Sequence, residues 1–414
     1  MTYKLGHISD IHAGYRSGRK LNLNGVNLRE QDGYNGLAEI VTDMINEEVD
    51  GVVVAGDTMH VPEPSIRALC EVQTQLRRLA DAKIKVYMLA GNHESTDIRA
   101  DIASSRIFDD SWRGIFSYAT PYEKLEITDG VWLHLVSHHM YGDQAHTMNQ
   151  IKSVDGAVNI FSTHGSVIDP LLEIALHAEA SPREIVIPDS LLEDYDWDYI
   201  LLGHIHERGW VGSKNKKTDT YGSKIYYNGS LLRRGFSDKE VPLGKGWTLW
   251  TIESDGTMTH DIRNVKQRTQ LDFSAINAEN MTAASVTEKI IENLRSSQED
   301  GDKFLEASAP ILRQQIVNLT PSKNLALDWR SIDAETQHSL MFLTKKTSDG
   351  KIEDSGSTIN TDSFAKNADI VQVYDSWVEN SEVLTGLSDT VKEKTKAQAR
   401  RFVKQGQEEN LSND

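Results

Sequence analysis

The first hundred residues alternate between short apolar runs and longer amphipathic segments. Short runs of mostly apolar residues, such as GVVVA, are typical of buried strands, whereas apolar residues that recur every three to four positions are typical of helices. These patterns predict strands over 3–8, 51–55 and 86–90, and helices over 33–48 and 64–79. Strands that alternate with helices predict βαβ units, and therefore an α/β fold.

From residue 131 onward the pattern changes to successive strands, predicted over 131–136, 159–163, 199–202, 225–228 and 247–252. We therefore expect residues 1–265 to form one domain, with one or two sheets flanked by helices.

The remaining residues form three further predicted regions. Residues 270–345 have the pattern of a small α+β domain, with a helix candidate at 286–294 and a strand candidate at 311–319. Residues 347–362 are polar, rich in glycine and serine, and without periodicity, which predicts a linker. Two helices are predicted within 363–405, the second of which is basic. Its basic residues are Lys392, Lys394, Lys396, Arg400, Arg401 and Lys404.

Composition narrows the class of protein. The chain has 414 residues, of which 38% are hydrophobic, and a net charge of −18. This charge argues against a protein that coats nucleic acid by bulk attraction, but not against a nucleic-acid enzyme whose site holds cations. No apolar run is long enough to span a membrane, and the N-terminus does not resemble a signal peptide. One cysteine, Cys70, fits the reducing cytoplasm, where we expect the protein to be located.

The most informative feature is the chemistry at the ends of the predicted strands. Five of them end in His, Asp or Asn, mostly beside glycine, in the stretches HISDIHAG, VVAGDTMH, GNHE, IFSTHGS and LLGHIHERG. The side chains concerned are Asp10, His12, Asp57, His60, Asn92, His93, His164, His204 and His206. Ligands of open α/β sheets gather at the carboxyl ends of the strands, so these side chains are expected to converge.

This set of residues has the chemistry of a metal site. In D-x-H and H-x-H the two side chains point the same way along extended backbone, so both can bind one cation or two neighbouring ones. Imidazole and carboxylate together suit Mn, Fe or Zn. Any single motif could be a turn or a helix cap, but the full ordered set favours a metal site. The other eight histidines are interpreted as surface or core residues, and a second site at SHHMYG, 137–142, is disfavoured.

The ordered set resembles the signature of the calcineurin-like metallophosphoesterases, and more narrowly the SbcD-type DNA double-strand-break repair nucleases, including bacteriophage-encoded ones. Three stretches are similar to the narrower family: AGDTMHVPEPS at 55–65, YYNGSLLRRGFSDKE with GKGW at 226–247, and APILRQQIV at 309–317. The resemblance implies a four-layer α/β fold, with two sheets flanked by helices, a small α+β cap domain over 270–345 that contacts DNA, and C-terminal helices over 363–405 that dock on an ATPase.

The resemblance also implies roles for individual residues. Asp10, His12 and His206 would hold one metal ion, and Asn92, His164 and His204 the other. Asp57 would bridge the two ions. His93 would act as general acid, and His60 would help to hold the scissile phosphate. Glu94 stands where the family usually has Asp, and we expect it to orient a neighbouring histidine.

We consider three functions. The first is a Mn²⁺-dependent DNA exonuclease or endonuclease in repair, recombination or replication, which works as a homodimer with an SbcC-like ATPase in a bacterial or phage-infected cell. The second is a small-molecule phosphodiesterase. The third, a scaffold with a dead site, is disfavoured because no ligand is lost. The family's dimer interface would involve helices near 64–79 and 98–108, although Leu69, Val72, Leu76 and Leu79 could equally face the sheet.

Overall fold

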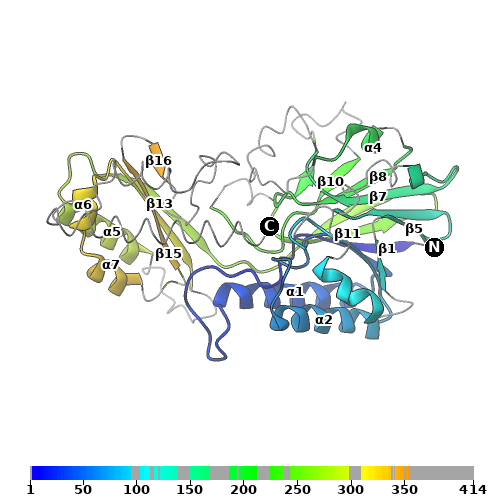
Figure 1. Ribbon diagram of the computed structural model, residues 1–414, viewed down its shortest axis with the longest axis horizontal. Helices are drawn as coiled ribbons and strands as arrows, with labels where there is room; N and C mark the ends of the chain where they lie inside the picture. The colour runs from blue at the N-terminus through cyan, green and yellow to red at the C-terminus, as the bar shows by residue number, and fades with distance from the viewer. Residues whose placement is uncertain are drawn as a thin grey trace, which may run out of the picture. The chain divides into compact units, whose positions relative to one another are not determined.

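Figure 1 shows the fold of the protein in a computed structural model. The structure describes residues 2–94, 103–111, 116–119, 122–138, 149–167, 186–193, 195–211, 224–236, 243–297, 309–336, 339, 341–348 and 351–353. Residue contacts divide the chain into two compact units, Met1–Thr344 and Lys345–Asp414.

The first sheet has six strands in the order β12-β11-β1-β2-β3-β4. Its strands are β1 (Tyr3–Ile8), β2 (Gly51–Ala55), β3 (Lys85–Leu89), β4 (Phe116–Tyr118), β11 (Gly246–Ile252) and β12 (Met258–Asn264). Strands β1 to β4 are parallel, whereas β11 and β12 pair antiparallel on one side. Every residue of β2 is buried, because a parallel sheet covered on both faces favours an unbroken apolar sequence.

The second sheet also has six strands, in the order β5-β6-β7-β8-β10-β9. They are β5 (Tyr122–Thr128), β6 (Val131–Val136), β7 (Val158–His164), β8 (Tyr199–Gly203), β9 (Gly209–Trp210) and β10 (Ile225–Tyr227). One buried cluster joins Leu5 and Val53 of the first sheet to Leu133 and Ile160 of the second, so the two sheets pack face to face.

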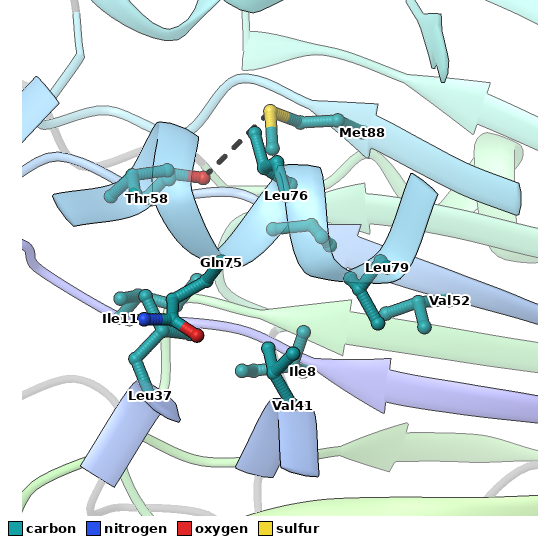
Figure 2. A pocket seen from close by; sticks show the side chains of 12 residues that line it. Ile8, Ile11, Leu37, Val41, Val52, Thr58, Gln75, Leu76, Leu79 and Met88 are labelled. Atoms are coloured by element: carbon teal, nitrogen blue, oxygen red, sulfur yellow. Dashed lines mark hydrogen bonds between the residues drawn. The ribbon is translucent and has the colours of Figure 1, made fainter. Parts of the chain in front are cut away.

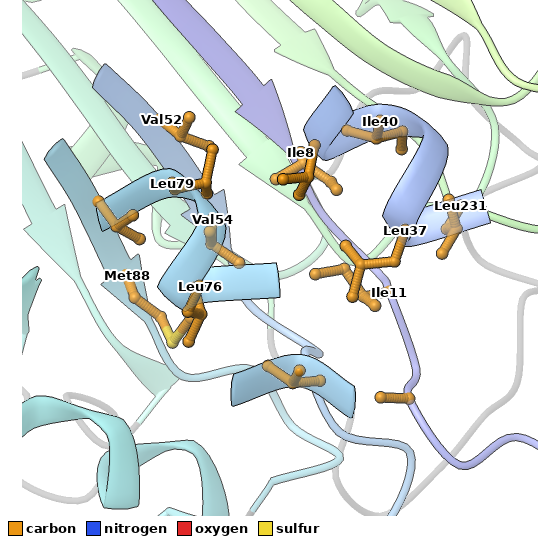
Figure 3. Packing of buried hydrophobic residues seen from close by; sticks show 14 of the residues in the cluster. Ile8, Ile11, Leu37, Ile40, Val52, Val54, Leu76, Leu79, Met88 and Leu231 are labelled. Carbon is orange, nitrogen blue, oxygen red and sulfur yellow. The ribbon is translucent and has the colours of Figure 1, made fainter. Parts of the chain in front are cut away.

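Helices cover the outer faces of the two sheets. α1 (Leu28–Asn46) and α2 (Ile66–Asp81) place their apolar stripes on the first sheet, where Ile40 and Leu76 join one core cluster with Val54 (Figure 3). Figure 2 shows the small apolar pocket at this junction. The short helix α4 (Asp189–Glu193) packs on the second sheet, and the 3₁₀ helix η1 (Ser104–Ser111) precedes β4. The predicted α/β fold with two sheets flanked by helices is therefore confirmed.

A third sheet follows, in the order β13-β14-β15-β16. Its strands are β13 (Gln270–Asn277), β14 (Ile311–Val317), β15 (Met341–Ser348) and β16 (Lys351–Glu353), and its helices are α5 (Ala283–Ser296), α6 (Pro321–Leu325) and α7 (Trp329–Glu335). Helix α5 shares its core with β14. The end of β15 and all of β16 fall within the segment 347–362 that is predicted to be a linker.

Two further differences concern the helices. α1 begins five residues earlier than predicted, because the Asn27 side chain accepts hydrogen bonds from the backbone N–H groups of Arg29 and Glu30 and caps the helix there. Val72, Leu76 and Leu79 of α2 are buried in the core, which settles that these three face the sheet. The predicted helices within 363–405 lie outside the described residues, and the domain boundaries stay a prediction.

No helix among the described parts of the chain has the length and apolar character that crossing a membrane requires.

Candidate metal centre

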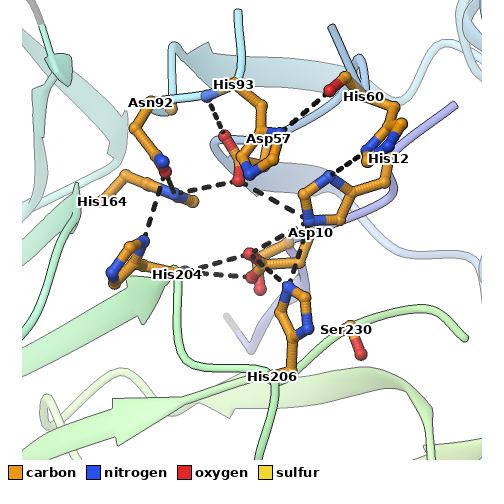
Figure 4. A network of polar contacts seen from close by, with 12 residues as sticks. Asp10, His12, Asp57, His60, Asn92, His93, His164, His204, His206 and Ser230 are labelled. Atoms are coloured by element: carbon orange, nitrogen blue, oxygen red, sulfur yellow. Dashed lines mark hydrogen bonds and ion pairs between the residues drawn. The ribbon is translucent and has the colours of Figure 1, made fainter. Parts of the chain in front are cut away.

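The segments that follow β1, β2 and β3 in the first sheet, and β7 and β8 in the second, meet at one place (Figure 4). All nine residues singled out from the sequence lie there: Asp10, His12, Asp57, His60, Asn92, His93, His164, His204 and His206. The convergence follows from the topology, because these strands are parallel within each sheet and their carboxyl ends share one edge.

One group of donor atoms surrounds Asp10. The Nε2 atoms of His12 and His206 are 3.1 Å apart. The Asp10 Oδ1 atom is 3.9 Å from His12 Nε2 and 3.7 Å from His206 Nε2. One carboxylate oxygen and two imidazole nitrogens thus face a common point, and this trio could hold a metal ion.

A second group surrounds Asn92. Its Oδ1 atom lies 3.0 Å from His164 Nε2 and 3.2 Å from His204 Nδ1. Asp57 stands between the two groups, since its Oδ2 atom is 3.6 Å from His12 Nε2 and 3.4 Å from His164 Nε2. A carboxylate in this position can face two cations at once.

The charges of the site fit cations. Asp10 and Asp57 are almost completely buried, and among the described residues no lysine or arginine lies in salt-bridge contact with either carboxylate. Burial holds the pKa of the His12 and His206 imidazoles well below the ordinary value, so their ring nitrogens keep the lone pairs that a metal needs.

His164 is charged differently. Burial alone would lower its pKa, but the attraction of Asp57 outweighs burial and raises the pKa to about 9. Burial raises the pKa of Asp10, and the nearby Asp57 charge adds to the shift. The site therefore attracts positive charge strongly enough to protonate a buried imidazole, and a bound cation would take the place of that proton. The donor set and its charge fit divalent metal ions.

The backbone is strained at the same residues. Asp10, His12, Asp57 and His204 have φ angles of 50°, 47°, 52° and 100°, in the left-handed region that residues with a Cβ rarely adopt. Strain of this kind persists only where the surrounding structure imposes it, and it concentrates at functional sites. Here it turns the carboxylates and imidazoles out of the strand direction and toward one another.

Two glycines make room for this crowding. A Cβ atom on Gly91 would collide with the carboxylate of Asp57, and one on Gly56 would collide with the ring of His164. Gly56 also has a φ of +84°. The glycines beside the polar residues at the strand ends thus allow the backbone to approach the site closely.

His93 and His60 lie on one side of the donor cluster. The backbone N–H of His93 donates to Asp57 Oδ1 at 2.9 Å, and its Nδ1 donates to the carbonyl oxygen of His60, also at 2.9 Å. Since a carbonyl only accepts, the proton of this bond resides on Nδ1, and Nε2 stays available. His93 is half-buried, whereas its neighbours Asn92 and Glu94 are buried.

The sequence predicts that Glu94 orients a neighbouring histidine, but the hydrogen bonds described for its side chain run to backbone N–H groups instead. Its Oε1 accepts from the backbone N–H of Met59 at 3.1 Å and its Oε2 from that of Gly91 at 2.8 Å. The side chain therefore joins the turns that follow β2 and β3. Burial first, and the Asp57 charge second, raise its pKa to about 7.

Three residues at the site were not singled out from the sequence: Tyr15, Arg234 and Lys245. The Nη2 atom of Arg234 lies 3.0 Å from His60 Nδ1, and its guanidinium carbon lies 4.5 Å from the centre of the Tyr15 ring. Buried Lys245 donates to the carbonyl oxygen of His206 at 2.6 Å. Arg234 and Lys245 fall in the stretch 226–247 that carries the family resemblance, but neither follows an apolar strand as the other site residues do.

The histidines outside the site agree with their interpretation as surface or core residues wherever the structure describes them. His7 and His134 are buried in the core, and His260 packs its ring against Trp250. His138 of the SHHMYG stretch is buried as well. His139, His146, His177 and His338 lie outside the described residues.

Comparison with known proteins agrees with this geometry. Residues 3–208 match the family model of the calcineurin-like phosphoesterases, and all nine predicted site residues fall within that range. Residues 3–208 belong to the calcineurin-like phosphoesterase family. The family match indicates a hydrolase of phosphoester bonds, and the two donor groups described above are the candidate ligands of its divalent metal ions.

Several curated relatives of this phosphoesterase are archaeal proteins named DNA double-strand break repair protein Mre11. The one from Halobacterium salinarum is 34% identical over 254 residues, which are 61% of this chain and 57% of that protein. The one from Sulfolobus acidocaldarius is 25% identical over 320 residues, 76% of this chain and 78% of that protein. For the first two relatives matched, the chain spans 30% and 57% of their length.

Among solved structures, a dimetal phosphatase from Danio rerio is 15% identical and covers 63% of this chain and 96% of its own, with a TM-score of 0.37. The assignment of the fold therefore rests on the strand order and on the family model.

Proposed function

We propose that this phosphoesterase is a DNA nuclease whose centre binds two divalent metal ions, Mn²⁺ in particular. The observation that carries the proposal is the division of the donors into two groups with Asp57 between them. The similarity to DNA double-strand break repair proteins over most of the chain supports DNA as the substrate.

The proposed ligands follow that division. One ion would be held by Asp10, His12 and His206, the other by Asn92, His164 and His204, with Asp57 bridging both. Two such ions would neutralise the charge that develops on the phosphoryl oxygens and activate water for in-line displacement.

His93 serves as the general acid. Its Nδ1–H is held by the carbonyl of His60, so the ring is fixed with Nε2 directed away from that bond. When the ring is protonated, Nε2 donates its proton to the departing 3′ oxygen, which would otherwise leave as an alkoxide. His60 lies beside it, with the two rings stacked at a centroid distance of 5.4 Å, and helps to hold the scissile phosphate.

The partners follow from the same resemblance. The nuclease acts as a homodimer together with an SbcC-like ATPase, and residues 363–405 provide the docking helices. A cap over 270–345 contributes to DNA binding. The single cysteine fits a cytoplasmic location, in a bacterial or phage-infected cell. The homodimer, the ATPase partner, the DNA-binding cap and the cytoplasmic location are predictions from the sequence.

The test is the release of label from linear double-stranded DNA in Mn²⁺ by the wild-type protein and by His93→Ala. The proposal predicts DNA degradation by the wild type and loss of at least about 100-fold in the variant, since general acid catalysis contributes roughly 10²–10⁴-fold. The variant should still bind two metal ions.

A chromogenic phosphodiester, tested in parallel, separates the two candidate substrates. The net charge of −18 gives no bulk attraction for DNA and so favours the alternative, a small-molecule phosphodiesterase. If the wild type cleaves the chromogenic diester but leaves DNA intact even with the ATPase partner present, the nuclease proposal is wrong and the alternative takes its place.

A further inference from the structure

The side chain of Arg234 lies against the candidate metal centre. Its Nη2 atom donates to His60 Nδ1 at 3.0 Å, and its Nη1 atom is 3.4 Å from His206 Nε2. Its guanidinium carbon lies 4.5 Å from the centre of the Tyr15 ring. The side chain therefore spans from a proposed metal ligand to the histidine on the proposed phosphate side.

The contacts of this arginine do not neutralise its charge. Among the described residues, no carboxylate lies in salt-bridge distance of the Arg234 guanidinium, and its partners are imidazoles and a phenol ring. The arginine charge lowers the pKa of His12, His60 and His206, although burial is the largest cause in each case. A half-buried cation beside a centre that would hold further cations is repelled by them, and an anion that joins them would offset this repulsion.

The loop around Arg234 is fixed from outside the site. The preceding residue, Arg233, accepts hydrogen bonds at its carbonyl oxygen from Arg29 Nη2 at 2.8 Å and from Gln270 Nε2 at 3.0 Å. Its backbone N–H donates to Gln267 Oε1 at 2.9 Å. Three bonds to one residue leave the loop little freedom, so the guanidinium of Arg234 is positioned before any ligand arrives.

The shape of the guanidinium indicates which anion would bind. Its planar fork of N–H groups matches two oxygens of a phosphate and can bind both at once. The face of the ring of Tyr15 supports one side of the fork by a cation–π contact. The guanidinium of Arg234 and the ring of His60 thus lie side by side next to the donor cluster, joined by a hydrogen bond.

We propose that Arg234, supported by Tyr15, is a substrate-binding residue that holds the non-bridging oxygens of the substrate phosphate beside the metal centre. The proposal rests on the proposed function only as far as hydrolysis of a phosphodiester, because it requires a phosphate in the site and not DNA as such. It adds a protein-borne cation to the charges that the metal ions supply.

The test compares Arg234→Gln and Arg234→Lys with Arg233→Gln as a matched control. The control removes an equal charge from the adjacent position, where the described side-chain contact is a single bond from Nε to the carbonyl of Gly235. Binding of inorganic phosphate to the Mn²⁺-loaded proteins is measured by calorimetry, and kcat and KM are measured on a chromogenic phosphodiester. Metal content and melting temperature are recorded for every variant.

We expect Arg234→Gln to weaken phosphate binding, and to lower kcat/KM for the diester, on the order of 10- to 100-fold, as for the loss of charge-assisted hydrogen bonds. Arg234→Lys should recover part of this loss, since it restores the charge without the fork, and Arg233→Gln should match the wild type. The proposal is overturned if Arg234→Gln, with metal content retained, binds phosphate as tightly as Arg233→Gln does. The small diester keeps this outcome separate from the nuclease proposal, which fails only if DNA is not cleaved.

Discussion

His7 should make this protein sensitive to acid. Its side chain lies between the two sheets, completely buried, 6.4 Å from the ring of Tyr226. Neither ring nitrogen has a hydrogen-bond partner among the described residues. Burial, and to a smaller extent the charge of Arg208, lower the pKa of His7 to about 3. In the folded protein this imidazole is therefore neutral at every pH above about 3.

The energetic consequence follows from the difference between the folded and unfolded states. In the unfolded chain His7 has its ordinary pKa of about 6.5. Between pH 6.5 and about 3, His7 is therefore protonated in the unfolded chain but neutral in the folded protein. Stability contributed by neutral His7 is therefore complete above pH 6.5 and is lost as the pH falls through that window. With these two pKa values the loss at pH 5 amounts to about 2 kcal/mol, against less than about 0.1 kcal/mol at pH 7.5.

The perturbation is His7→Leu, which keeps similar volume and removes the titrating group. Urea unfolding of the protein in a chelator, followed by tryptophan fluorescence at pH 7.5 and at pH 5, measures both proteins. The variant should be at least as stable as the wild type at pH 7.5, because it no longer buries unpaired ring nitrogens, and should gain about 2 kcal/mol on the wild type between pH 7.5 and pH 5. An equal loss of stability in both proteins over this range would refute the reasoning.

Three further substitutions probe other contacts. Gly91→Ala should lower metal affinity by at least tenfold in equilibrium dialysis, since its Cβ collides with the carboxylate of Asp57; unchanged affinity would contradict the requirement for glycine. His134→Leu should cost about 1–3 kcal/mol in urea unfolding at neutral pH, because both ring nitrogens are hydrogen-bonded, and a neutral result would contradict that network. Arg268→Ala removes a two-pronged ion pair to Asp32, which keeps its bond to Arg29, and should lower stability by about 1–3 kcal/mol; an unchanged stability would show that Arg29 alone neutralises Asp32.

The sequence predicted much of the first domain, for an identifiable reason. A strand buried on both faces, such as Gly51–Ala55, has a short, unbroken apolar sequence, and its bounds were predicted without error. The polar residues that follow such strands were assembled correctly because parallel strands bring their carboxyl ends to one edge. The convergence of these side chains could thus be predicted without any three-dimensional information.

Other features left no comparable signal. Arg234 reaches the site from a loop, so no strand end marks it, and its orientation depends on contacts of Arg233 with residues 204 positions before and 37 positions after it in the chain. The contacts of Glu94 with two backbone N–H groups depend on how neighbouring turns pack. Helix α1 begins earlier than the sequence predicts, although the capping residue Asn27 is visible there, because the apolar period becomes regular only later.

The measurement that tests the central claim most directly is the number of Mn²⁺ ions bound per chain, determined by equilibrium dialysis and elemental analysis. Two ions are predicted for the wild-type protein, and one for His206→Ala, since His206 belongs to the donor group around Asp10 and not to the one around Asn92. A single ion in the wild type, or two ions of unchanged affinity in the variant, would contradict the proposed two-metal centre.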